Sequence, residues 1–254
     1  MSKPPTDPLQ AYVLRLGDNA LILGQQASAW CGHAPVLEED IALANVSLDL
    51  IGQATLWLEY AAQLMEGEHT ADALAFLRDE RDFRNVLLVE QPNGDYGKTL
   101  VRQYLFDAWH LPLLGQLMHS TDETVAAIAA KARKEVHYHL ERSRELVIAL
   151  GRGTQESHGR MQAAFDDLWR FTGELCAADA VDAAMASAGV GAALEEVASA
   201  YRAELSSSLA AAGLAMPAGE GMSSGGKAGL HSEHMGPLLA QMQFLQRAYP
   251  GQSW

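Results

Sequence analysis

The chain has 254 residues, of which 48% are hydrophobic and 20% charged, and its formal net charge is −14 with a pI near 5.0. This length allows a well-buried core, while the acidic balance disfavours nucleic acid and anionic membranes as partners, because both are bound through basic patches. The chain shows no secretory signal, no apolar run long enough to cross a bilayer and no zinc or disulfide pattern of cysteines, so we expect a cytoplasmic protein with reduced thiols.

Alanine and leucine recur at helical spacing along almost the whole chain, which predicts an all-α protein. We expect residues 1–8, which are rich in proline, to form a flexible leader. Gly32 and Pro35 break the first helical run, and Thr121 and Asp122 are candidate caps for a later one. The expected helices cover about 9–30, 36–65, 72–82, 98–119, 123–150, a stretch from about 158, an alanine-rich pair over 179–212, and 232–247.

The long helices come as two consecutive hairpins, followed by shorter helices towards the C-terminus. This order favours a four-helix bundle with additional C-terminal helices. No internal repeat is strong enough to indicate a solenoid. We therefore expect a single domain, in which the glycine-rich segment 216–230 is a surface loop and not a domain linker.

Four carboxylates are embedded in apolar helical sequence, namely Asp18, Asp49, Asp107 and Glu135. Such acids are costly to bury unless they are paired or bind a metal. If the hairpins bend near residues 33–34 and 121, the two acids of each hairpin are equally far from the bend, about 21–24 Å along the helices. The four acids are then expected to converge at mid-bundle, one from each helix. That is the layout of ferritin-like di-iron carboxylate proteins.

The histidines of such a centre are missing at their usual spacing. Two of its helices normally carry acid-x-x-His, but here the third residue after Asp49 is Gly52 and the third after Glu135 is Tyr138. Four carboxylates without imidazoles make an anionic, under-ligated site, because iron in such a site prefers mixed nitrogen and oxygen donors. We therefore expect a degenerate centre in which the Tyr138 phenol hydrogen-bonds the acid cluster, while His137 and His139 lie on its flanks.

Two other arrangements of the same acids stay open. His110 and His139 lie three and four residues after acids, so the four carboxylates could still hold iron together with one of these rings. Alternatively the acids form a hydrogen-bonded polar cluster neutralised by Arg15, His110 or Arg142, or some of them face solvent or a partner.

Other candidate motifs are weaker. His231 and His234 are three residues apart, whereas the histidines of the zinc-protease motif are four apart. Lys227 follows two glycines but lacks the full phosphate-loop spacing, which leaves it as a possible contact for a partner or for an anionic ligand such as CoA. No nucleophile elbow is present. Trp254 ends the chain and is a candidate for docking on a partner.

Several motifs, spread over residues 9–254 with matching spacing, resemble one family. They are LRLGDNALIL, WCGHAP, DIALANVSLDLIGQA, RDERDFRNVLLVEQPNGDY, RQYLFDAWH, LWRFTGELC and GGKAGLHSEHMGPLLAQMQFLQR. The chain resembles the PaaC family, the structural subunits of bacterial phenylacetyl-CoA 1,2-epoxidase, a multicomponent ring-epoxidising oxygenase. The resemblance implies a ferritin-like bundle that is not an enzyme on its own and acts in aerobic phenylacetate degradation.

The resemblance also implies partners and cofactors. A catalytic, PaaA-like ferritin-like subunit would carry the di-iron centre, and a small PaaB-like subunit would bridge such pairs. A reductase with FAD and an Fe–S cluster would supply electrons from NADPH, so that no cofactor resides in this chain. The isolated chain is expected to self-associate through its unfilled interface. The alternatives are a catalytic subunit that binds iron itself and a standalone ferritin-like iron protein.

Overall fold

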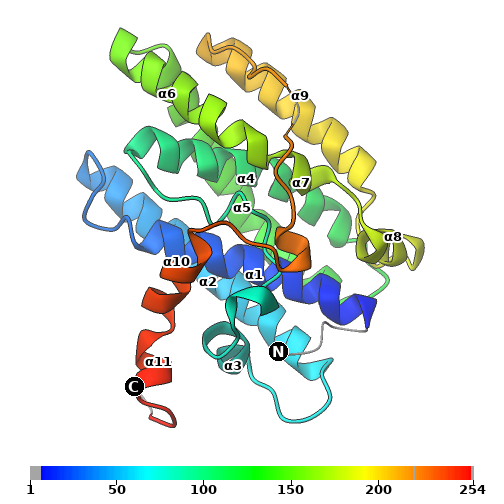
Figure 1. Ribbon diagram of the computed structural model, residues 1–254. Coiled ribbons are helices and arrows are strands. Elements are labelled where there is room, and N and C mark those ends of the chain that lie inside the picture. The colour runs from blue at the N-terminus through cyan, green and yellow to red at the C-terminus, as the bar shows by residue number, and fades with distance from the viewer. Residues whose placement is uncertain (1–6, 220, 253–254) are drawn as a thin grey trace.

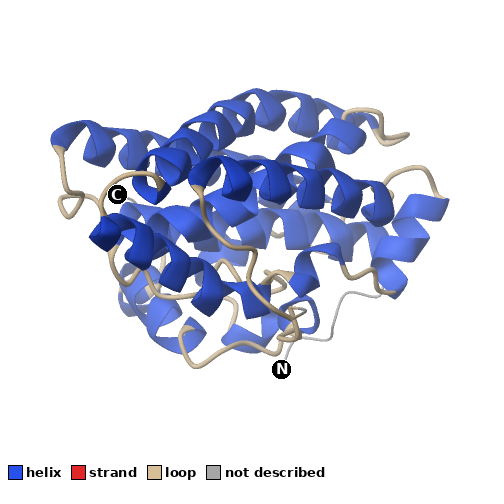
Figure 2. Cartoon of the chain, turned by 90° about the horizontal axis from the view of Figure 1, so that it is seen from above, coloured by secondary structure: helices blue, strands red, loops and turns tan. Residues whose placement is uncertain are grey.

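The computed structural model describes residues 7–219 and 221–252, and within them every regular element is a helix (Figure 1; Figure 2). The long helices are α1 Pro8–Ser28, α2 Leu37–Gln63, α4 Tyr96–Leu117, α5 Glu123–Gly151, α6 Gln155–Leu168 and α9 Leu194–Ala212. The short helices are α3 Ala71–Phe76, α7 Gly173–Cys176, α8 Ala180–Ser187, α10 Met235–Met242 and α11 Phe244–Ala248, and the 3-10 turns are η1 Glu80–Asp82, η2 Trp169–Phe171 and η3 Gly226–Ala228. The prediction of an all-α fold is confirmed.

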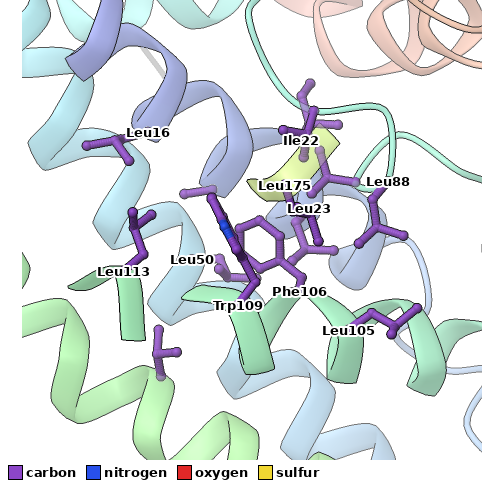
Figure 3. Close-up of a cluster of buried hydrophobic side chains, with 14 of the residues drawn as sticks. Leu16, Ile22, Leu23, Leu50, Leu88, Leu105, Phe106, Trp109, Leu113 and Leu175 are labelled. Atoms are coloured by element: carbon purple, nitrogen blue, oxygen red, sulfur yellow. The ribbon is translucent and has the colours of Figure 1, made fainter. Parts of the chain in front are cut away.

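The bundle is built from two hairpins, α1 with α2 and α4 with α5. The helices α6 and α9 pack on α4 and α5, while α10 and α11 project at the other side of the bundle (Figure 1). Buried side chains of α1, α2 and α4 meet around Phe106 and Trp109 (Figure 3). Gly17 brings α1 close to α2, because a β-carbon there would lie 2.8 Å from Leu58 Cδ2.

Side-chain caps explain where several helices begin. The Asp7 carboxylate accepts a hydrogen bond from the Leu9 amide, and Asp95 does the same for the Lys98 amide at the start of α4. Asp122 caps α5 as predicted, by accepting from the Val125 amide. Each cap satisfies an amide that would otherwise lack a partner in the first turn.

Pro8, expected in a leader covering residues 1–8, already belongs to α1, and the Asp7 cap fixes the start of that helix. Residues 1–6 lie outside the described part of the chain, and so does Trp254.

An irregular segment, 83–91, runs through the interior between η1 and α4. Most of its side chains are buried, although it contains no long helix. Its backbone is satisfied by side chains from elsewhere: the Val86 amide donates to Asn19 Oδ1, and the Leu87 amide donates to Glu174 Oε2. Because these partners are distant in the sequence, the burial of this segment cannot be predicted from helical periodicity.

Within the expected loop 216–230, residues 225–227 pack against this interior segment and its partner Glu174. Gly226 is buried, and a β-carbon at this position would lie 2.1 Å from the Asn85 carbonyl oxygen. The carboxylate of Glu174 accepts hydrogen bonds from the Gly225 and Lys227 amides. The described part of 216–230 therefore includes exposed side chains such as Met222 together with a backbone that is held to the bundle at residues 225–227.

Candidate functional site

The two hairpins are out of the register that the sequence suggested. A β-carbon on Gly24 would touch Leu50, and one on Gly17 would touch Leu58, so Asp18 lies about eight residues, or ~12 Å, from the level of Asp49. In each hairpin the second helix extends about ten residues, or ~15 Å, past the level at which the first helix ends, as the pairs Gly24–Leu50 and Asp107–Ser143 show. The expected convergence of four acids at one level is therefore wrong.

The same displacement separates the acids of the second hairpin. Ser143 Oγ lies 3.2 Å from Asp107 Oδ2, so Asp107 is level with Ser143 and not with Glu135. Glu135 is eight residues away on α5, which corresponds to about 12 Å along the helix.

Asp18 is fully buried and has its own cationic partner. Arg78, which follows α3, binds both carboxylate oxygens, and the Arg84 amide donates to Oδ2 at 2.8 Å. The guanidinium of Arg78 also lies 4.1 Å from the centre of the Phe83 ring. Arg15, expected to neutralise Asp18, instead binds Asp179. The carboxylate thus anchors the segment after α3 to α1.

Two polar contacts join α2 and α5 at mid-bundle. His139 Nε2 lies 3.0 Å from Asp49 Oδ2, and Gln53 Nε2 donates to Glu135 Oε2 at 2.9 Å. His139 and Gln53 are buried, whereas the Asp49 side chain is 40% exposed. The sequence analysis identified both acids and His139 but missed Gln53. Its position four residues after Asp49, on the same face of α2, could have indicated that it belongs to this contact.

Asp107 lies deeper in the bundle and has only neutral hydrogen-bond partners. Gln103 Nε2 donates to Oδ1 at 2.7 Å, and Ser143 Oγ contacts Oδ2. Burial raises the pKa of Asp107 to about 7, against a smaller opposing effect of His139. His110 is packed among aromatic rings, and burial lowers its pKa to about 3, so this ring is neutral at physiological pH.

Tyr138 and Gly52 occupy the two positions where a di-iron centre would carry histidines. The Tyr138 side chain is 56% exposed, so the expectation that its phenol joins the acid cluster is wrong. The ring that turns inward is that of His139, one residue later, because a shift of one residue turns a side chain by about 100° around the helix. A β-carbon on Gly52 would meet no atom within 4 Å.

The residues present do not fit a di-iron centre. Such a centre needs carboxylates and imidazoles from four helices around one point, whereas here each of the four acids is bound by a different partner. Within the described ranges, no group of three or more His, Cys, Asp or Glu side chains is placed to hold a metal ion. The arrangement that is observed is a set of separate polar contacts between helices.

The remaining candidate residues are engaged within the chain. Lys227 Nζ donates to the Ala177 carbonyl at 2.9 Å and to Asp182 at 3.0 Å, which removes it as a free contact for CoA phosphates or a partner. His231 lies between Glu90 and the Phe83 carbonyl, so neither ring nitrogen is free to bind a metal with His234. Burial disfavours the charged His231 ring, but Glu90, the Phe83 carbonyl and Asp18 together outweigh it and raise the pKa of His231.

One face of the bundle is apolar and uncovered. It consists of the exposed side chains Leu37, Ile41, Leu48 and Ile51 of α2 and Tyr138 of α5, and is called the α2–α5 face below. By length and composition α2 is apolar enough to cross a membrane, contrary to the sequence-based expectation, but it packs along α1 as a core helix does. Only 44% of its most apolar window is buried, so the rest is available for a protein partner.

Comparisons with known proteins give one consistent result. The family model for phenylacetic acid catabolic proteins matches residues 1–254. The chain is similar to the C subunit of the 1,2-phenylacetyl-CoA epoxidase of Escherichia coli strain K12. The two are 52% identical over 246 residues, which cover 97% of this chain and 99% of the relative.

Proposed function

The chain belongs to the family of phenylacetic acid catabolic proteins, and from this premise we propose that it is the structural, non-catalytic subunit of a phenylacetyl-CoA 1,2-epoxidase. The observation that carries the proposal is the 52% identity to the C subunit of such an enzyme, over nearly the full length of both chains. The complex would add one oxygen atom across the aromatic ring of the CoA thioester, in the cytoplasm, during aerobic phenylacetate degradation.

The separate binding of the acids supports a non-catalytic role. Asp18 is bound by Arg78, and the other three acids have their own hydrogen-bond partners on α2, α4 and α5. These contacts hold helices together in the way that a shared metal would, without redox chemistry. The iron, and the FAD, Fe–S cluster and NADPH that serve it, would belong to the catalytic subunit and the reductase.

The α2–α5 face supports pairing with a second ferritin-like chain. Its exposed leucine and isoleucine side chains follow one side of a long helix, a shape that fits against another helical bundle. We propose that this face is covered by the catalytic subunit, that a small subunit bridges such pairs, and that the isolated chain self-associates through the same surface.

Metal analysis distinguishes this role from the two iron-binding alternatives. We expect the isolated chain, purified with ferrous iron present, to contain well under one iron per chain and to show no oxygenase activity alone. The co-expressed complex should contain iron and be active. Stoichiometric iron in the isolated chain that a chelator removes only slowly would contradict the proposal and favour an iron-binding enzyme or a standalone iron protein.

Substitution of the α2–α5 face tests the pairing. Ile41 and Leu48 are 53% and 67% exposed, so their replacement by aspartate leaves the core intact. We expect the double variant Ile41→Asp/Leu48→Asp to bind the co-expressed catalytic subunit at least about 30-fold more weakly, because the apolar contact is lost. The measurement is co-purification followed by titration of the two purified chains.

Met222→Asp is the matched control, since Met222 is an exposed apolar residue of the C-terminal segment, at 87% exposure. We expect it to leave the affinity unchanged. If the α2 variant binds as tightly as the wild type while keeping its melting temperature, the partner does not use this face.

A further inference from the structure

The two acids of the α2–α5 face are each held by one oxygen only. Asp49 Oδ2 is bound by His139, and Glu135 Oε2 is bound by Gln53. The second oxygen of each carboxylate accepts no hydrogen bond from the described residues. Two negative groups therefore present a free oxygen between α2 and α5.

The two carboxylates lie at the edge of the exposed apolar face. Leu48 precedes Asp49 on α2, Tyr138 precedes His139 on α5, and both side chains are exposed. Gly52 lies on the same side of the helix as Asp49, three residues later, and the space above it is empty. The surface over Gly52 is thus open to a long side chain from outside.

Within the described ranges, no lysine or arginine of this chain neutralises the pair. Arg142, two turns beyond Glu135 on α5, is bound to Glu39. The His139 ring already uses Nε2 on Asp49, while its Nδ1 and the Gln53 Oε1 are buried without a partner. When a partner covers the apolar face, carboxylates left without a cation would be desolvated at a large cost in free energy.

We propose that Asp49 and Glu135 form an acidic anchor that receives an arginine or lysine of the partner chain, inserted over Gly52. This inference rests on the proposed function, which supplies the partner. It adds the chemistry of the partner's contact surface, a helix face that carries one cationic side chain among apolar ones. The anchor fixes the position of the two bundles, since apolar contact alone has little directionality.

The test replaces both carboxylates by amides of the same shape, which removes their negative charges. In the double variant Asp49→Asn/Glu135→Gln, the amide oxygens still accept from His139 and Gln53, so the fold is retained. We expect its affinity for the co-expressed catalytic subunit to fall on the order of 30-fold at low ionic strength. The remaining affinity should depend less steeply on salt concentration than that of the wild type.

Asp166→Asn/Glu195→Gln is the control with the same change in charge, on exposed positions of α6 and α9, which pack on α4 and α5. It should keep both the affinity and the salt dependence. If the anchor variant behaves like this control, the acidic anchor is disproved while the pairing stands. If the wild-type chain itself binds no partner, the proposed function fails first.

A second variant tests the approach over Gly52 without changing any charge. Gly52→Leu adds a side chain where no atom lies within 4 Å, so the melting temperature should be unchanged or higher. We expect pairing to weaken at least about tenfold, because the leucine occupies the path of the incoming cation. Unchanged affinity for this variant would show that the partner does not enter over Gly52.

Discussion

Replacing Asp18 by alanine is expected to lower the free energy of unfolding by about 3–5 kcal/mol, because it leaves the guanidinium of Arg78, whose side chain is only 11% exposed, without its counter-ion. The carboxylate is fully buried and also accepts from the Arg84 amide, so the alanine removes three contacts at once. Chemical denaturation at constant pH measures the effect.

A double-mutant cycle separates this pairing from general packing. Arg78→Met alone should also be strongly destabilising, whereas the double variant Asp18→Ala/Arg78→Met should cost less than the sum of the two single changes, with a coupling of about 1–3 kcal/mol. Additive effects, or a loss below about 1 kcal/mol for Asp18→Ala, would contradict the role of Asp18 as a buried anchor.

The helices and their order could be predicted from the sequence because their signals are local. Apolar spacing indicated the long helices to within a few residues, and the Asp122 cap was identified from residue type and position. The segment 83–91 was not predicted as buried, since its amides depend on Asn19 and Glu174, which are far away in the chain.

The arrangement of the acids could not be predicted because it depends on how the hairpins are offset. The sequence shows where each helix starts, but not that α2 and α5 extend about ten residues past the level at which α1 and α4 end. Asp18 binds Arg78 instead, sixty residues away in the chain. No local pattern marks Arg78 as the partner of Asp18. Likewise, no local pattern around Lys227 indicates that its ammonium group binds Asp182, which is 45 residues away in the chain.

The choice between Tyr138 and His139 shows a second limit of spacing arguments. A ligand pattern of acid-x-x-His directed attention to the third residue after Glu135, which is Tyr138. The fourth residue, His139, is the one that turns inward to Asp49, because positions three and four after a residue lie on either side of it on the helix. Which of the two is buried is decided by the neighbouring helix.

Replacing Asp107 by asparagine is expected to stabilise the protein above neutral pH by about 2–4 kcal/mol. Burial raises the pKa of Asp107 from 3.8 to about 7, so between about pH 4 and 7 the folded chain keeps a proton that the unfolded chain has lost. The stability of the wild type therefore falls as the pH rises through this window, and above about pH 7 the buried group carries an unfavourable charge. Asparagine mimics the protonated acid: its oxygen accepts from Gln103 and its amide group donates to Ser143.

Denaturation of both proteins at several pH values between about 4 and 9 measures the effect. The difference should be small near pH 4, grow up to about pH 7 and then stay constant, whereas Asp166→Asn, at an exposed position of α6, should show no such trend. A variant that is less stable than the wild type at about pH 8 would mean that the Asp107 carboxylate is needed in its charged form. A cation within the bundle would then have to balance it, which neither Gln103 nor Ser143 can do.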